Sequence, residues 1–340
     1  RCRGINLSLM LGIAYGASIG GVATLVGTPP NLVFARVYSI AFPEEPAISF
    51  GQWILFGLPF SFVLLFGVWL LMTRVLCRVD KELQLDSETL REEREGLGRM
   101  SREEKVVAVI FAATALLWVF RTDITVGSMR IPGWTKLWEP FGAVHDGTIA
   151  IAMALLLFLI PGRGGLRGGA ILDGSIFAKV PWGIVLLFGG GFALANGFGS
   201  SGLSEWVAHK FTGTEGVSPF WTIFLVSGGI NLLTELTSNT ATTQMFLPLL
   251  ASMAVGLGIH PMLLMVSATI SASMAFMMPV ATPPNAIVFG SGYIRIVQMV
   301  RVGCWINVLA LGLTVLYVWF LVPLIFDISQ MPVSALESID

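Results

Sequence analysis

Charge is scarce in this sequence of 340 residues, of which Asp, Glu, Lys and Arg together make up only 12%. Soluble domains carry about twice that share, and 55% of the residues here are hydrophobic, so the composition excludes an ordinary soluble enzyme. The 20 basic residues are matched by 21 acidic ones, which leaves no basic excess for binding nucleic acid. The composition predicts a polytopic membrane protein.

Cysteine is scarce as well. The three cysteines, Cys2, Cys77 and Cys304, lie far apart, so they form neither a disulfide framework nor a CxxC metal site. We expect them to be buried as small hydrophobic residues. The sequence also lacks an HExxH motif and a carboxylate pair in its apolar segments, and we therefore expect a protein that is not an enzyme.

Long apolar segments dominate what is present. A membrane-crossing helix needs about 20 apolar residues, and candidate segments of roughly this kind occur at 5–26, 51–76, 105–121, 147–161, 181–198, 219–236, 241–258, 260–281 and 303–326. Several of these segments are short. Three longer apolar stretches, 5–40, 219–258 and 260–294, are interrupted by polar residues or prolines at 27–31, 237–240 and 281–285.

The distribution of basic residues predicts the orientation. A dense charge run at 77–105 is typical of a solvated helical linker, and the positive-inside rule places such a segment in the cytoplasm. If 5–40 runs outward, the only basic residues outside are Arg36, Arg121, Arg130, Lys136 and Lys210. We interpret 219–258 as a hairpin that enters and leaves on the outer side, because its centre, Ser238-Asn239-Thr240, has no charge and no turn glycine. Two full spans would give the same orientation.

One short motif occurs twice. Gly27-Thr28-Pro29-Pro30-Asn31 matches Ala281-Thr282-Pro283-Pro284-Asn285 at four of five positions, with an offset of 254 residues (281 minus 27). A Pro-Pro pair removes two backbone donors and forces the preceding residue out of the helical region, so each helix must break. Broken backbone survives in lipid only where it lines a protein cavity, and paired breaks point to the central site of a transporter. The alternative is two ordinary proline kinks in packed helices.

A second polar group surrounds the centre of the hairpin, at 234–243. Glu235 is the only formally charged residue between Glu215 and Arg295. An anion bound here would therefore rely on hydroxyls, amides, helix N-termini and a bound cation. Glu235 itself serves either a proton-coupled step or, as we favour, a structural role in which it is neutral or hydrogen-bonded within the hairpin.

These motifs resemble the divalent anion/sodium symporter family. The resemblance rests on Thr-Ser-Asn-Thr-Ala-Thr-Thr at 237–243, on the two proline motifs, and on 18–31 and 182–191. It implies an all-α polytopic membrane protein with two inverted repeats, broken helices and re-entrant hairpins. It also implies a homodimeric elevator-type carrier in the lipid bilayer that moves dicarboxylates, citrate or sulfate, usually with sodium.

The resemblance also implies roles for individual residues. The substrate would contact the hairpin tip and both proline motifs, through Ser238, Asn239, Thr240, Thr282, Pro283, Thr28 and Pro29. One sodium ion would be held by the backbone oxygens of Thr234 and Thr237, together with Asn239 and Ala281. Gly27 would lend its carbonyl to a sodium site of the first repeat.

The family pattern has two Ser-Asn-Thr tips, whereas this sequence has one. The chain therefore looks like the C-terminal two-thirds of a family member. We expect the end of the first repeat at 1–76, a cytoplasmic linker at 77–105 and scaffold helices with an interfacial helix (199–213) at 106–218. The hairpin, second broken helix and last span follow at 219–328, and a tail at 329–340.

We therefore predict a secondary transporter of the bacterial inner or plasma membrane, which couples sodium to the entry of a di- or tricarboxylate, with a C4-dicarboxylate such as succinate as the first choice. The nearest alternatives are a sodium-independent dicarboxylate exchanger and a sulfate carrier. A channel and a membrane-embedded enzyme that uses Glu235 and a histidine are the more distant ones. No nucleic-acid partner is expected.

Overall fold

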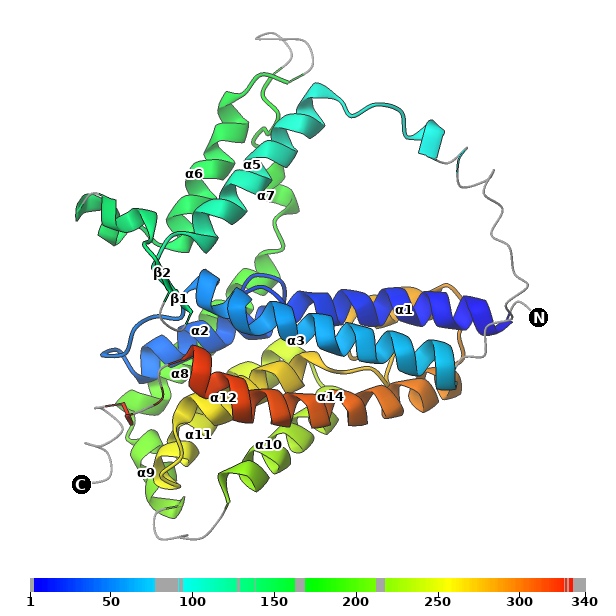
Figure 1. The fold of residues 1–340 in the computed structure, drawn as a ribbon. Coiled ribbons are helices and arrows are strands. Elements are labelled where there is room, and N and C mark those ends of the chain that lie inside the picture. The colour runs from blue at the N-terminus through cyan, green and yellow to red at the C-terminus, as the bar shows by residue number, and fades with distance from the viewer. Residues whose placement is uncertain are drawn as a thin grey trace. The chain divides into compact units, whose positions relative to one another are not determined.

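The computed structural model describes residues 3–76, 91, 94–126, 129–137, 139–162, 169–211, 218–326, 328 and 330–332 (Figure 1). The chain divides into two units, which are described separately: one comprises Arg1–Ile48, Gln52–Val79 and Gly183–Asp340, and the other Ser49–Gly51 and Asp80–Trp182. Most of the predicted linker and the last eight residues of the predicted tail (333–340) lie outside the described residues.

The first unit is built of helices. In chain order they are α1 (Arg3–Val22), α2 (Pro29–Ala41), α3 (Phe50–Leu71, extended by a π-helical turn at Met72–Leu76), α8 (Trp182–Ser200), α9 (Leu203–Phe211), α10 (Pro219–Thr234), α11 (Asn239–Gly256), α12 (Pro261–Ser273), α13 (Pro283–Gly290) and α14 (Ile296–Ile325). Among the described residues, three helices are long and apolar enough to cross a membrane: Phe50–Leu76, Trp182–Ser200 and Ile296–Ile325.

The two predicted helix breaks are confirmed, but each lies before the proline pair. α1 ends at Val22 and α2 begins at Pro29, while α12 ends at Ser273 and α13 begins at Pro283. The apolar segments predicted to reach 26 and 281 therefore stop short as helices. Proline suits the first helical position because its φ is already helical and its missing N–H is not needed there. The preceding Thr28 and Thr282 are extended, with φ of −144° and −138°.

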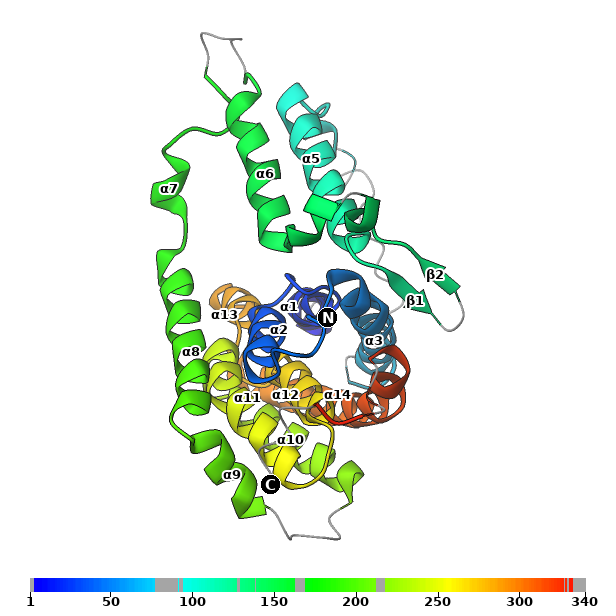
Figure 2. The same ribbon diagram turned by 90° about the vertical axis from the view of Figure 1, so that its left-hand side faces the viewer.

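The halves of the two broken helices pack crosswise. α1 lies against α13, and α2 lies against α11 and α12 (Figures 1 and 2). The Tyr15 hydroxyl donates to the carbonyl of Phe276 at 2.8 Å, and the two rings meet edge to face. Trp53, Phe34 and Leu264 are fully buried in the same unit. Segments more than 250 residues apart in the chain thus form one core.

The hairpin predicted at 219–258 corresponds to α10 and α11, which pack against each other and against α12. The interfacial helix predicted at 199–213 is shorter than expected, because α8 continues to Ser200 and α9 begins at Leu203. Gly202 separates them with φ of +74°, a left-handed conformation that few other residues tolerate.

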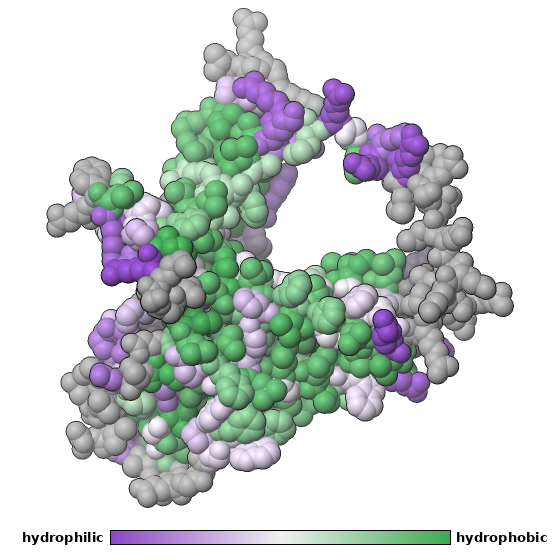
Figure 3. All heavy atoms as spheres, viewed as in Figure 1, coloured by the Kyte–Doolittle hydropathy of each residue, from purple (hydrophilic) through white to green (hydrophobic). Residues whose placement is uncertain are grey.

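Large apolar side chains also cover the outside of the first unit. Phe62, Phe66 and Trp69 of α3 and Phe320 of α14 are exposed, and Figure 3 shows a hydrophobic surface over this face. Such a patch needs a non-aqueous neighbour, and lipid supplies one. Cys304 lies on α14 and is exposed, so the prediction of burial is wrong for this cysteine; Cys2 and Cys77 lie outside the described residues.

The second unit contains α5 (Arg102–Val119), α6 (Asp146–Leu159), α7 (Ile176–Lys179) and an antiparallel pair of short strands, β1 (Ile124–Val126) and β2 (Met129–Ile131). Two 3-10 turns, Trp134–Leu137 and Glu139–Ala143, follow the strands. α5 begins with a capping box, in which Ser101 and Glu104 each bond the other's backbone N–H.

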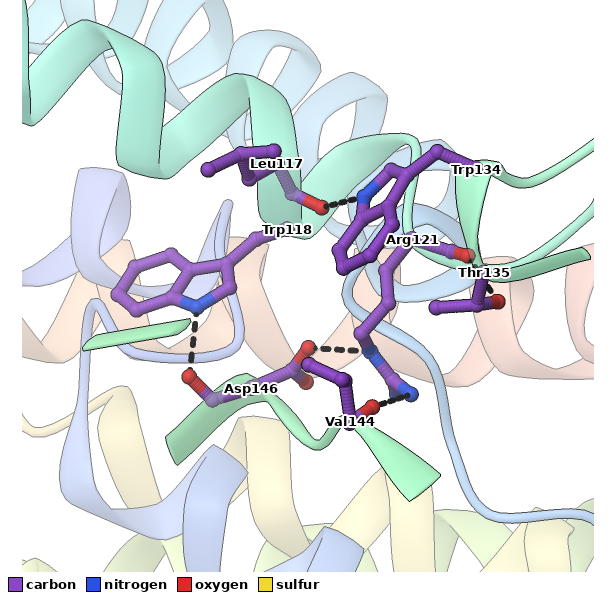
Figure 4. A network of polar contacts seen from close by, with 7 residues as sticks. All are labelled: Leu117, Trp118, Arg121, Trp134, Thr135, Val144 and Asp146. Carbon is purple, nitrogen blue, oxygen red and sulfur yellow. Dashed lines mark hydrogen bonds and ion pairs between the residues drawn. The ribbon is translucent and has the colours of Figure 1, made fainter. Parts of the chain in front are cut away.

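A polar network closes the connection between α5 and α6 (Figure 4). Arg121 donates to the Asp146 carboxylate at 2.6 Å and to the carbonyl of Val144 at 3.2 Å. The indole of Trp118 donates to the carbonyl of Asp146, and the indole of Trp134 to that of Leu117. The bond from Trp134 pairs a carbonyl in the last turn of α5, which the helix would otherwise leave unpaired.

Candidate functional site

The hairpin tip gathers oxygen atoms from three segments. Thr234 is the last residue of α10 and Asn239 the first of α11. The Thr234 hydroxyl lies 2.6 Å from Asn239 Oδ1 and 2.9 Å from the carbonyl oxygen of Ala272, at the end of α12. Thr234 is completely buried. Two residues that the sequence assigned to the same sodium ion are therefore in direct contact.

The remaining tip residues differ in exposure. Ser238 precedes α11 in an extended conformation and is exposed, while Thr240 is buried. The Thr237 hydroxyl donates to the carbonyl of Leu233 at 2.9 Å. The same hydroxyl lies 2.6 Å from the hydroxyl of Thr242. This hydroxyl is engaged within the hairpin, and the contribution of the Thr237 backbone to a sodium site stays a prediction.

Glu235 links the hairpin to the second break. Its carboxylate is 2% exposed and accepts the backbone N–H groups of Phe276 (2.8 Å), Met277 (3.0 and 3.1 Å) and Met278 (2.8 Å). It also accepts a bond of 2.7 Å from the side-chain amide of Asn307. All of these partners are donors, which is the pattern an ionised carboxylate requires.

These contacts give Glu235 a structural position, as we favoured, but correct its partners. It was expected to bond within the hairpin, whereas the four groups above belong to the loop after α12 and to α14. The loop offers three successive N–H groups that no helix uses, and this concentration of donors makes it the better partner for a buried anion.

The carbonyl groups of both breaks bind asparagine. Asn285 Nδ2 donates to the carbonyls of Ala275 and Met278, at 3.0 and 3.1 Å. Asn31 Nδ2 donates to those of Thr24 and Val22, at 2.9 and 3.4 Å. Two carbonyls at each break are thus bound within the protein, as a membrane interior requires.

The predicted site residues of the two proline motifs differ in how exposed they are. Ala281 and Thr282 are buried, Thr28 is half-buried, and Gly27, Pro29 and Pro283 are exposed. A side chain at Gly27 would overlap the carbonyl oxygen of Gly21, so glycine is needed there. Among the described residues, hydrogen bonds join the tip to the second break through Thr234 and Glu235, and none is seen between the tip and Thr28, Pro29 or Pro283.

Three residues at the site were not singled out from the sequence. Asn307 of α14 binds Glu235, and Asn231 of α10 donates to the carbonyl of Met274 at 2.6 Å. Gly303 of α14 lies so close to the loop that a side chain there would overlap the carbonyl of Phe276. The available signal was an isolated amide in an apolar helix, which is costly in a membrane unless it has a partner.

This donor set suits a monovalent cation. Hydroxyl, amide and freed backbone oxygens are the ligands that transporters use for sodium at unwound helix segments. Within the part of the chain that the structure describes, no cluster of three His, Cys, Asp or Glu residues is present to hold a metal ion. The residues at the tip therefore fit sodium.

The fold and this site define a class, that of α-helical membrane transporters with broken helices. A family model described as the sodium:sulfate symporter transmembrane region matches residues 2–326. The chain belongs to that family, which confirms the resemblance seen in the sequence.

Relatives in the family are transporters by name. The chain is 42% identical over 322 residues to the sodium-dependent dicarboxylate transporter SdcS of Staphylococcus saprophyticus, a match that covers 94% of this chain and 60% of the relative. It is 41% identical over 326 residues to the protein of the same name in Staphylococcus aureus strain MRSA252, covering 95% of this chain and 60% of that relative. The chain thus spans about 60% of the length of these relatives.

Proposed function

We propose that this chain carries the second half of the transport site of a sodium-coupled symporter, which brings a C4-dicarboxylate such as succinate across a bacterial inner membrane. The observation that carries the proposal is the buried contact between Thr234 and Asn239 beside a broken helix. The names of the relatives agree with both the ion and the class of substrate.

Sodium would be held at the tip by Thr234, Thr237 and Asn239 together with the carbonyl of Ala281, and in the first repeat by Gly27. When bound, it supplies positive charge beside an anion in a region that has no Lys or Arg between 216 and 294. The one acidic residue in that region is Glu235, whose carboxylate binds the loop after α12.

The substrate carboxylates would bind at helix N-termini. α11 begins at Asn239 without a side-chain cap, so its first turn presents free N–H groups and a partial positive charge. α13 begins with Pro283 and Pro284, which have no N–H, and its Asn285 N–H is bound by Thr282; this terminus offers the partial charge of the helix dipole. Ser238, Asn239, Thr240, Thr282 and Pro283 surround these termini. Thr28 and Pro29 occupy the equivalent position at the start of α2.

The larger architecture is part of the same proposal. Inverted repeats are supported by the matching breaks and by their crosswise packing. In an elevator mechanism the helices of 1–76 and 219–328 would move together, and the scaffold helices of 106–218 would carry a homodimer contact. A charge-poor moving part suits such a step, because fewer charges have to cross the bilayer.

Labelled succinate uptake into proteoliposomes tests the function, with the protein encoded by the complete gene and an inward gradient of sodium or of potassium. Sodium-driven accumulation is expected. Equal exchange against internal succinate in both salts would contradict symport and identify an exchanger. Sodium-driven uptake of sulfate without succinate uptake would identify a sulfate carrier.

A further inference from the structure

The asparagine that ends each proline motif has the same environment in both halves of the chain. Asn31 and Asn285 are both completely buried. Asn285 uses its side-chain amide to bind two carbonyls of the loop that precedes α13, and Asn31 binds one carbonyl of the loop that precedes α2 and that of Val22, the last residue of α1. Neither residue is among those assigned above to substrate or sodium.

One carbonyl in each loop links this asparagine to a predicted sodium ligand. The carbonyl of Met278 accepts from Asn285 Nδ2 at 3.1 Å and from the backbone N–H of Ala281 at 3.3 Å. The carbonyl of Thr24 accepts from Asn31 Nδ2 at 2.9 Å and from the backbone N–H of Gly27 at 3.1 Å. These three positions correspond at the offset of 254 that relates the two motifs, since Thr24, Gly27 and Asn31 match Met278, Ala281 and Asn285. The second carbonyl that each asparagine binds differs by one position, Val22 in the first half and Ala275 in the second.

We propose that Asn31 and Asn285 are matched positioning residues for the two sodium sites. Each holds one carbonyl of its loop, and that carbonyl accepts the N–H of Gly27 or Ala281 and so anchors the residue whose own carbonyl is predicted to bind sodium. The inference rests on the proposed function, because it concerns how the coupling ion is held.

The second loop is held from two directions. Glu235 binds the N–H groups of Phe276, Met277 and Met278, while Asn285 binds the carbonyls of Ala275 and Met278. A loop whose donors and acceptors are both bound to buried side chains has few alternative conformations. Sodium then binds without first having to order the loop, which saves the conformational entropy of ordering it.

In both asparagines only the NH₂ group of the side chain makes hydrogen bonds to the rest of the described chain, and the amide oxygen makes none. Oδ1 of Asn31 and Oδ1 of Asn285 are buried and have no hydrogen-bond partner among the described residues. A buried polar atom without a partner destabilises a fold. The amide orientation follows from its neighbours, because two carbonyl oxygens can be bound only by the NH₂ group.

Replacement by aspartate is the sharpest variant, since it keeps the shape and removes both donors. Asn31→Asp and Asn285→Asp are compared with wild type, using the complete protein purified in detergent. Ser61→Ala serves as the matched control, because Ser61 is buried and its hydroxyl donates to the carbonyl of Ile19 at 2.9 Å in the helix before the first break. Asn31→Ser and Asn285→Ser retain one donor and replace the aspartate variants if those do not fold.

Two measurements separate positioning from stability: the rise in Tm when sodium replaces choline, and the sodium concentration that gives half-maximal succinate uptake. We expect each asparagine variant to raise that concentration by about tenfold or more, as loss of an outer-shell partner typically does, and to reduce the sodium-dependent rise in Tm. Ser61→Ala should lower Tm equally in both salts and leave the sodium requirement within about twofold of wild type.

The inference is overturned if the asparagine variants behave like Ser61→Ala, with a lower Tm and an unchanged sodium requirement. A wild-type protein that shows neither a sodium-dependent rise in Tm nor sodium-driven uptake would instead contradict the proposed function. The two failures are distinguishable because the first appears only in the variants and the second already in the parent protein.

Discussion

At the scale of single residues, the hairpin tip illustrates how polar groups are tolerated inside an apolar unit. Thr234 and Asn239 bind each other, and Thr234 also lies within bonding distance of the carbonyl of Ala272. A buried hydroxyl or amide is costly without a partner, so these side chains stabilise the fold before any ion binds. A cation that approaches them meets oxygens that are already in place.

Asn239→Ala tests the tip directly. The substitution removes Oδ1, which lies 2.6 Å from the Thr234 hydroxyl, and we expect sodium-dependent succinate binding to be abolished. The fold should survive, because Thr234 keeps the carbonyl of Ala272 as a partner. Sodium-dependent Tm shifts and circular dichroism measure the two effects. Unchanged sodium dependence in the variant would show that Asn239 is not a ligand.

Glu235→Gln tests the buried carboxylate. Glutamine keeps the size of the side chain but places an NH₂ group against donors, so at least one N–H of the loop at 276–278 loses its acceptor. An unpaired buried group costs about 1–3 kcal/mol, and we expect a lower Tm in the absence of sodium. Glu205→Gln, which changes an exposed acid on α9, should leave Tm unchanged. Equal Tm values for both variants would contradict the assigned role of Glu235.

At the scale of elements, the loop after α12 depends on how closely α14 approaches it. Gly303 permits this approach, because any side chain there would overlap the carbonyl of Phe276. That carbonyl also accepts the hydroxyl of Tyr15 from α1. One carbonyl of the second break is thus in contact with two helices from opposite ends of the chain.

Gly303→Ala should therefore destabilise the protein. Steric overlap in a packed interior typically costs 1–3 kcal/mol, and a chemical-denaturation curve in detergent measures it. Gly312→Ala is the matched control on the same helix, since nothing lies within 4 Å of a side chain at Gly312; there we expect no loss, because alanine has the higher helix propensity. The packing argument fails if the two variants lose the same stability.

At the scale of the whole molecule, the outer surface of the first unit is as apolar as its core. Exposed Phe62, Phe66 and Phe320 and the apolar surface in Figure 3 place α3 and α14 against lipid. The interior, by contrast, holds buried asparagines, threonines and a glutamate. The unit thus holds polar side chains among its buried hydrophobic residues and exposes large apolar side chains on α3 and α14.

Cys304 reports on this surface. It is exposed on α14 and lies eight residues into the helix, about 12 Å from its start at 1.5 Å per residue. With Cys2 and Cys77 replaced by serine, we expect a lipophilic maleimide to label Cys304 in membranes and a membrane-impermeant sulfonated maleimide to leave it unmodified until the protein is denatured. Rapid labelling of the native protein by the sulfonated reagent would place this face of α14 in water.

The sequence predicted more of the helices than of the contacts between them. The breaks at both proline motifs, the hairpin arms and the family were all read from the order of residues. The exact break positions were predicted too late in the chain, because Pro29 and Pro283 start helices instead of interrupting them. Asn307 and Gly303 were not predicted as site residues. An amide or a glycine in an apolar helix does not show which residue it contacts until the helices have packed.

Two kinds of information are therefore separable in this protein. Composition, apolar segments and Pro-Pro pairs by themselves determined a membrane-spanning helical chain with two breaks, because those properties act through the local backbone and through transfer into lipid. Only the tertiary structure decided that Glu235 binds the loop at 276–278, that Asn31 and Asn285 hold equivalent carbonyls, and that Tyr15 reaches Phe276. These contacts join residues that the chain separates, and their energies depend on distances that exist only after the helices have packed.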